Sequence, residues 1–115
     1  MELNELESQI LIDIYDADML PGMSLDIENF KLKEADPKEK KQEFAFYLGK
    51  LKKLGFIKYE EKDAFLKGGI RSIKYNNNIT TINEDKVHID SKGIKLVEWY
   101  NHSNLAIQKN EYKCG

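Results

Sequence analysis

Apolar side chains near the start of the chain recur at helical spacing. Residues three or four positions apart lie on one face of an α-helix, and four apolar residues have this spacing: Leu3, Leu6, Ile10 and Ile14. Leu11 and Tyr15 widen the same face. The pattern predicts an amphipathic helix over Glu2–Ala17, which Pro21 and Gly22 bring to an end.

A less regular pattern follows this break. The apolar residues between Ser24 and Lys33 fit neither the helical period nor the alternation of a strand. We expect a short helix over Asp26–Leu32, and a first β-strand in the same place is the alternative.

The best-defined helix is expected over residues 37–54. Asp36 is a residue type that caps a first turn, Pro37 suits the first helical position, and Glu39 stands where a capping box has its second member. Gly55 readily adopts the left-handed conformation that ends helices. The inward face is expected to carry five apolar residues: Phe44, Tyr47, Leu48, Leu51 and Leu54.

The opposite face of this helix is expected to be open to solvent. With 3.6 residues per turn, that face carries Gln42, Ala45, Phe46, Gly49, Lys50 and Lys53. Phe46 is the large apolar side chain among them. It either packs under the strands that follow or anchors a protein partner, because exposed aromatic side chains often mark interfaces.

The pattern changes from helical to extended after Gly55. Residues 56–60 and 70–75 are rich in β-branched and aromatic side chains, which favours strands. Gly68 and Gly69 are expected to form the turn between them.

Two further short strands are expected after this pair. The run Asn76–Asn78 predicts a turn, and residues 79–82 and 87–89 have strand-forming composition. His88 alternates with apolar neighbours and is expected to face solvent. Together these strands would form a wing over about residues 56–89.

A last helix is expected near the end of the chain. The candidates for its cap are Asp90 and Ser91, and those for its inward face are Ile94, Val97 and either Trp99 or Tyr100. Residues 104–115 form either a second short helix or a tail. A chain of 115 residues is expected to form a single domain, here over residues 1–103, with this segment appended.

The order of helix, glycine, large apolar pair and basic strand is typical of a helix-turn-helix recognition helix that runs into a wing. We therefore expect an α+β fold of the winged helix-turn-helix class. It would have a three-helix core, an extended β-wing and a C-terminal helix.

Residues at the end of the helix expected over 37–54, and at the end of the wing, match a pattern known from one protein family. The relevant residues are Leu51, Gly55, Phe56 and Ile57, followed by Ile89, Ser91, Lys92, Gly93, Ile94 and Glu98. With this spacing the chain resembles the YjcQ-like family of small winged-helix proteins, found in low-GC Gram-positive bacteria and their phages. Asp90 stands where that family usually has Thr, and Leu96-Val97 where it has Tyr-Leu. The resemblance covers about residues 3–102 and implies a winged-helix fold, but no particular function.

The net charge of −2 conceals an uneven distribution. Residues 1–30 hold eight acidic side chains and no Lys or Arg, whereas residues 31–75 hold thirteen basic and seven acidic side chains. Because a nucleic acid responds to the local field of a protein, the basic segment indicates a binding surface despite the acidic total.

Duplex DNA is the expected partner of this segment, and regulation of transcription is the expected function. A recognition helix reads base edges in the major groove, and a wing contacts the backbone or the minor groove. The candidate contacts are Lys38, Lys41, Gln42, Phe46, Lys50 and Lys53 on the helix and Lys67, Arg71 and Lys74 in the wing. Glu39 and Glu43 on the same helix would repel phosphates. The alternative is a protein-interaction module of phage or mobile-element origin that uses Phe46 or the acidic first helix.

Enzymatic chemistry is not expected. The two histidines, His88 and His102, and the single cysteine lack the spacing of metal ligands, and the chain has no nucleophile or phosphate-binding motif. We therefore assign no catalytic residue, metal or cofactor. Cys114 is expected to be a free thiol close to the end of the chain.

Cellular location and assembly also follow from the pattern. No apolar run approaches the roughly 20 residues that a membrane span needs, and the acidic start lacks the basic region of a signal peptide. The chain is therefore expected to be cytoplasmic. Apolar side chains in its last part would support a homodimer through the terminal helices, or would close the core against the first helix: Trp99, Tyr100, Leu105, Ile107 and Tyr112.

Overall fold

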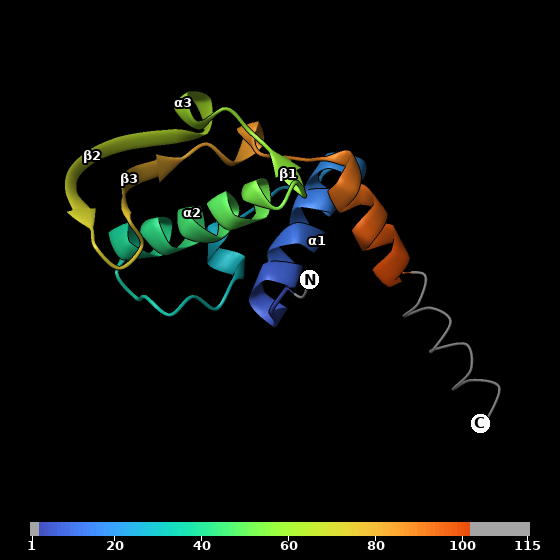
Figure 1. Cartoon of the computed structure of the whole chain (residues 1–115), viewed down its shortest axis with the longest axis horizontal. Coiled ribbons are helices and arrows are strands. Elements are labelled where there is room, and N and C mark those ends of the chain that lie inside the picture. The colour runs from blue at the N-terminus through green and yellow to red at the C-terminus, as the bar shows by residue number, and fades with distance from the viewer. Residues whose placement is uncertain (1–2, 102–115) are drawn as a thin grey trace, which may run out of the picture.

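The computed structural model describes residues 3–101, which form helices and two small antiparallel sheets (Figure 1). The helices are α1 (Glu5–Met19), α2 (Pro37–Lys53) and α3 (Glu61–Ala64), with the 3₁₀ turns η1 (Ile27–Asn29) and η2 (Glu84–Lys86). The strands are β1 (Ile57–Lys58), β2 (Phe65–Ser72), β3 (Asn77–Ile82) and β4 (His88–Ile89). A final helix begins at residue 91 and continues to residue 101. The expected α+β class is confirmed, while the expectations for residues 104–115, including Cys114, lie outside the described residues.

Helix α1 begins with a reciprocal capping box. The Asn4 side chain accepts the backbone N–H of Glu7 at 2.7 Å, and the Glu7 carboxylate accepts the backbone N–H of Asn4 at 2.9 Å. Two of the backbone donors that a helix start leaves unpaired are satisfied in this way. The amphipathic first helix is confirmed, but it starts at Glu5 and continues to Met19.

Helix α2 has the ends that its sequence predicts. The Asp36 carboxylate accepts the backbone N–H groups of Lys38 and Glu39. At the other end Gly55 has a φ of 84°, and the N–H groups of Gly55 and Phe56 bond the carbonyls of Lys52 and Leu51. This is the Schellman pattern, in which a left-handed residue lets the chain turn back over the last helical turn.

The short helix expected over Asp26–Leu32 is present only as a single 3₁₀ turn, and the strand offered as its alternative is wrong. The structure has the short turn η1 there, which Asp26 starts by accepting the N–H of Glu28. Leu25, Ile27 and Phe30 are all buried. Their spacing of two and three residues lets an irregular segment turn all three inward, which neither a regular helix nor a regular strand would do.

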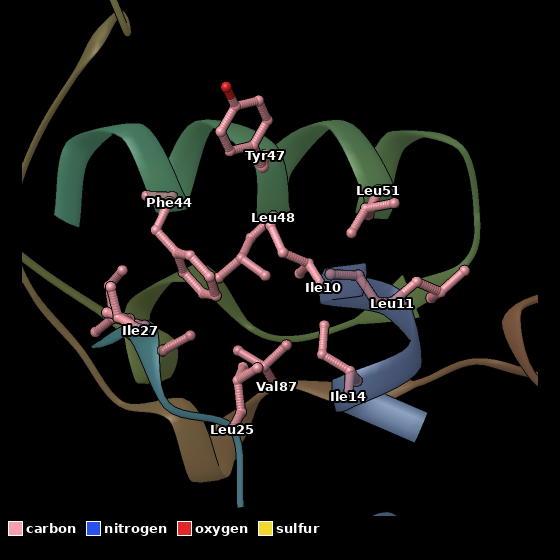
Figure 2. Close-up of a cluster of buried hydrophobic side chains, with 14 of the residues drawn as sticks. Ile10, Leu11, Ile14, Leu25, Ile27, Phe44, Tyr47, Leu48, Leu51 and Val87 are labelled. Atoms are coloured by element: carbon pink, nitrogen blue, oxygen red, sulfur yellow. The ribbon is translucent and has the colours of Figure 1, made fainter. Parts of the chain in front are cut away.

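The core lies between α1 and α2 (Figure 2). Phe44, Leu48 and Leu51 point from α2 toward Ile10, Leu11 and Ile14 of α1, while Leu25, Ile27 and Val87 close the far side. Tyr47 is buried, but it points away from this cluster. Most of the predicted inward face is therefore confirmed, and Leu54 is partly buried at its end.

A two-stranded sheet holds the end of α1 to the later part of the chain. β1 pairs with β4 in antiparallel register, with Ile57 opposite Ile89. The Asp18 carboxylate accepts the N–H of Ile89 at 2.6 Å and lies 2.9 Å from Nδ1 of His88. The exposure expected for His88 is confirmed, and its side chain gains a partner that the sequence did not indicate.

The second sheet is the hairpin formed by β2 and β3, hereafter the hairpin. The turn expected at Gly68 and Gly69 is wrong, because both residues lie inside β2 and the chain reverses instead over residues 73–76. Asn76 supplies the left-handed residue of that turn, with a φ of 56°. Gly69 also has a positive φ, and the pairing register shifts across it, so it bends the strand without ending it.

A close contact at the start of the final helix gives a first prediction. A Cβ on Gly93 would lie 2.2 Å from the carbonyl oxygen of Phe56 and 3.0 Å from Cγ1 of Ile89. Gly93→Ala is therefore expected to lower the free energy of unfolding by about 1–3 kcal/mol, the range for overpacking, as measured by urea denaturation. Gly68→Ala is the control, because its Cβ would meet only Thr80 Cγ2, at 3.8 Å. Equal losses in the two variants would contradict this account.

Candidate nucleic-acid interface

The hairpin lies along α2, on a different side from α1 (Figure 1). The Asn77 side-chain amide donates to the carbonyl oxygen of Gln42 at 3.0 Å, and both Gln42 and Ala45 are buried. With the core on one side and the hairpin on another, α2 has a narrow exposed face. We call it the α2 stripe; its members are Glu39, Phe46, Lys50 and Lys53.

Beside the α2 stripe runs a groove of about 430 Å³, hereafter the basic groove. Its lining includes four aromatic rings, three lysines and two asparagines: Phe46, Tyr59, Phe65, Tyr75, Lys50, Lys52, Lys53, Asn76 and Asn77. Glu61 also lines it, but its carboxylate lies 2.8 Å from the Lys67 ammonium, whose hydrogen bond lowers the pKa of Glu61. Within residues 3–101, Lys52 and Lys53 form no ion pair. The groove therefore combines aromatic rings with positive charge, and the Lys52 ammonium lies 4.4 Å from the centre of the Tyr59 ring.

The aromatic rings in the basic groove are held by one another. The Phe46 ring lies 6.0 Å from that of Tyr75 and 5.7 Å from that of Tyr47, and 43% of Phe46 stays exposed. Phe46 thus packs against the hairpin and also presents an open face. Burial raises the pKa of Tyr59 to about 12, so its hydroxyl stays protonated even at strongly alkaline pH.

Lys50 is tied to α1. Its ammonium lies 2.7 Å from the carboxylate of Glu7, which is almost completely buried. Burial by itself would raise the pKa of Glu7, but the hydrogen bonds from Lys50 and Asn4 outweigh it and lower the pKa. Lys50 therefore compensates a buried charge in addition to lining the basic groove.

A second set of the predicted contacts gathers around a hollow of about 430 Å³ at the start of α2. Its lining includes Lys38, Gln42, Arg71 and Lys74, together with the acids Glu34, Asp36 and Glu39. The Lys74 ammonium lies 2.6 Å from the Glu34 carboxylate, which also accepts the Tyr75 hydroxyl at 2.8 Å. Arg71 donates to the backbone and side-chain oxygens of Asn76 and so braces the turn. Lys74 and Arg71 are therefore used within the fold, and three acids share the hollow with Lys38.

The nine predicted DNA contacts thus occupy different surroundings. Phe46, Lys50 and Lys53 line the basic groove, whereas Lys38, Gln42, Arg71 and Lys74 line the hollow at the start of α2. Lys67 is paired with Glu61, and Lys41 is partly buried. The expectation that Glu43 would face phosphates is wrong, because its side chain is fully buried.

Sequence reasoning missed several members of the basic groove. Lys52, Tyr59, Tyr75 and Asn76 were not among the candidates. The Lys-Tyr pairs 58–59 and 74–75 were the available signal, since each puts a cation next to an aromatic ring. Their convergence depends on the hairpin folding back over α2, which no local pattern shows.

Comparison with known protein families, with curated proteins and with solved structures finds no match for this chain. None of the helices in the part of the chain that the structure describes has the length and apolar character to cross a membrane. The same residues contain no cluster of His, Cys, Asp or Glu that could hold a metal ion.

The contact between the hairpin and the loop before α2 predicts an acid-dependent stability. Hydrogen bonds from Lys74 and Tyr75 lower the pKa of Glu34 from 4.5 to about 2. A carboxylate whose pKa is lowered by folding stabilises the fold fully above its unfolded pKa, and this contribution is lost as pH falls through the folded value. Glu34→Gln is therefore expected to flatten the decline in the free energy of unfolding between about pH 4.5 and pH 2, measured by urea denaturation at each pH.

Glu60→Gln is the matched control for this pH series. Glu60 is exposed and forms no side-chain ion pair within the described residues. Its variant should keep the wild-type slope. A Glu34→Gln profile parallel to that of the wild type would show that the Glu34 contacts do not stabilise the fold.

Proposed function

We propose that this protein is a non-enzymatic winged helix-turn-helix protein that binds duplex DNA as a regulator. In this proposal α2 is the recognition helix and the hairpin is the wing. The order of α1, α2, β1 and hairpin supports the winged-helix assignment, with η1 in the place of a middle helix. The observation that carries the DNA assignment is the basic groove, where Lys52 and Lys53, which form no ion pair within the described residues, lie beside the exposed Phe46 ring and the Asn76 amide.

The position of the basic groove suggests how DNA would be contacted. Lys52 and Lys53 extend from the last turn of α2 and would meet phosphates, which supply most of the affinity of such complexes. The Phe46 ring would make an apolar contact with the methyl group of a thymine. Because the hairpin covers Gln42, this side chain would not read a base edge, and we infer a weak sequence preference.

Lys53 offers a direct test of the DNA proposal. The affinity for mixed-sequence duplex DNA is expected to fall steeply between about 50 and 200 mM salt, because phosphate contacts release counterions. Lys53→Ala should reduce the slope of log K against log salt by about 1, the effect of one lost phosphate contact. Fluorescence anisotropy with labelled duplex measures both quantities.

Lys40→Ala is the control on the same helix. Lys40 lies toward the other side of α2 and contacts Glu28 at 3.4 Å, so its removal should leave the salt slope unchanged. An absence of binding at low salt would overturn the DNA proposal. Equal slope changes in the two variants would show that the basic groove is not where DNA binds.

A protein-interaction module is the second candidate function. The hairpin exposes three large apolar side chains that the fold does not use: Leu66, Ile70 and Ile73. Ile73 is 99% exposed and Ile70 is 82% exposed. Large exposed apolar side chains are found at sites that bind other proteins.

Ile73 separates the two candidates. Ile73→Ser is expected to change the free energy of unfolding by no more than about 0.5 kcal/mol, because the side chain packs against nothing. If the protein is an interaction module, Ile73→Ser should strongly reduce the capture of a protein partner. The wild type and the variant are immobilised, and the proteins that each retains are quantified by mass spectrometry. If the wild type and Ile73→Ser retain the same proteins, the exposed Ile73 side chain is not part of a protein-binding site.

A further inference from the structure

We propose that the basic groove holds one unpaired nucleotide, whose base lies over Gly49 and against the Phe46 ring. Its phosphate would lie at Lys52 and Lys53, in the last turn of α2. This inference rests on the proposed function in one respect, since it also brings nucleic-acid chemistry to the basic groove. It goes beyond that function by naming a nucleotide outside base pairing as the preferred ligand.

The structure of the described residues does not require a glycine at position 49. Gly49 lies inside α2 with helical backbone, where glycine is less stable than alanine. Outside its own helix, and among the described residues, a Cβ there would meet only the Tyr59 hydroxyl, at an ordinary van der Waals distance of 3.9 Å. The missing side chain leaves the backbone of α2 open to the basic groove, which Gly49 lines. A ligand that lies directly against the helix accounts for the glycine, because a side chain would hold it away.

The neighbours of Gly49 along the helix suit a planar, anionic ligand. Phe46, Gly49 and Lys53 stand at helical positions i, i+3 and i+7, so they follow one another along one side of α2. Phe46 keeps 43% of its surface exposed one turn before Gly49, and Lys53 lies one turn after it. A base over Gly49 would therefore have the Phe46 ring on one side and an ammonium group on the other. Stacking of bases on aromatic side chains beside cationic groups is the usual way in which proteins hold single strands.

The basic groove favours an unpaired base over a paired one. Its volume of about 430 Å³ lies within the range of small-molecule sites, about 300–1,000 Å³, so it admits one nucleotide, whereas a duplex would only lie across it. Within a duplex the neighbouring bases cover both faces of a base, and a protein reaches only its edges. An unpaired base can turn its face to an aromatic side chain. The exposed face of Phe46 is therefore used fully only by a base that has left its pair.

Polar groups around the basic groove fit the rest of a nucleotide. Lys52 and Lys53 form no ion pair within residues 3–101 and are available to a phosphate. On the hairpin side, Arg71 donates to the side-chain oxygen of Asn76 at 3.0 Å. This contact leaves the NH₂ group of Asn76, which also lines the groove, to donate to a carbonyl oxygen of the base.

Gly49→Ala separates ligand binding from folding. It should raise the melting temperature by about 2–5 °C, because alanine favours the helix. It should also weaken the binding of a fluorescently labelled oligothymidylate about tenfold, the scale of one base stack, because the added Cβ takes the place of the base. Circular dichroism measures the first quantity and fluorescence anisotropy the second. A Gly49→Ala protein that is more stable but binds as the wild type does would overturn the proposal.

Two further variants support this test. Phe46→Leu keeps an apolar side chain but removes the ring, so it should also weaken oligothymidylate binding about tenfold. Gly68→Ala carries the same substitution in β2, outside the lining of the basic groove, and should leave this binding unchanged. Equal losses in Gly49→Ala and Gly68→Ala would overturn the assignment of the base to Gly49.

A pair of duplexes separates this inference from the proposed function. A duplex with one bulged thymine should bind about tenfold more tightly than the fully paired duplex of the same sequence, and Gly49→Ala should remove the difference without changing the affinity for the paired duplex. Equal affinity of the wild type for the two duplexes would overturn the inference and leave duplex binding intact. Binding of the bulged duplex alone would overturn the proposed function and support the inference.

Thymidine 5′-monophosphate distinguishes the two sources of such a nucleotide. If it displaces the bulged duplex from the wild type but has no such effect on Gly49→Ala, the basic groove accepts a free nucleotide. If it displaces nothing while the bulged duplex keeps its advantage, the nucleotide must belong to a nucleic-acid strand. In either case the shared ligand is an unpaired base with its phosphate.

Discussion

The fold around α2 depends on one buried carboxylate. Glu43 is completely buried, and its two oxygens accept the backbone N–H groups of Lys33 and Glu34 and the hydroxyl of Tyr47, at 3.0–3.2 Å. A buried charge without such partners is strongly destabilising. The loop before α2 must therefore run where these donors reach Glu43, and that path puts Glu34 in contact with Lys74 and Tyr75 of the hairpin turn.

This constraint also determines which part of α2 is open to a ligand. Because the hairpin is held along the first half of the helix, Gln42 and Ala45 are covered, and three of the exposed cations of α2 lie in its last turns: Lys50, Lys52 and Lys53. The basic groove combines Lys52 and Lys53 with Phe46 of α2 and Tyr75 of the hairpin. A surface of this composition suits phosphate and apolar contacts better than a row of hydrogen bonds to base edges.

Local features of the sequence predicted the parts of the fold that depend on neighbouring residues. Asp36 and Gly55 set the ends of α2 through contacts within a few residues, so both could be recognised without the structure. The burial of Glu43 could not be recognised from the sequence, since the backbone N–H groups that its carboxylate accepts lie nine and ten residues earlier. The role of Gly69 was misread for a related reason: a positive φ suits a bend inside a strand as well as a turn. Most of the basic groove likewise depends on contacts between α2 and the hairpin.

The arrangement of α1, α2 and the hairpin explains how a chain of net negative charge can present a basic groove. The acidic first helix and the hairpin pack on different sides of α2, and Glu7, the buried acid of α1, is compensated by Lys50. A helix with its side chains is about 10–12 Å across, whereas charges in water are screened over about 8 Å at physiological ionic strength. The exposed acids of α1 therefore act weakly at the basic groove. The field that an approaching phosphate meets there is set mainly by Lys52 and Lys53, and the total charge of the chain is a poor guide to it.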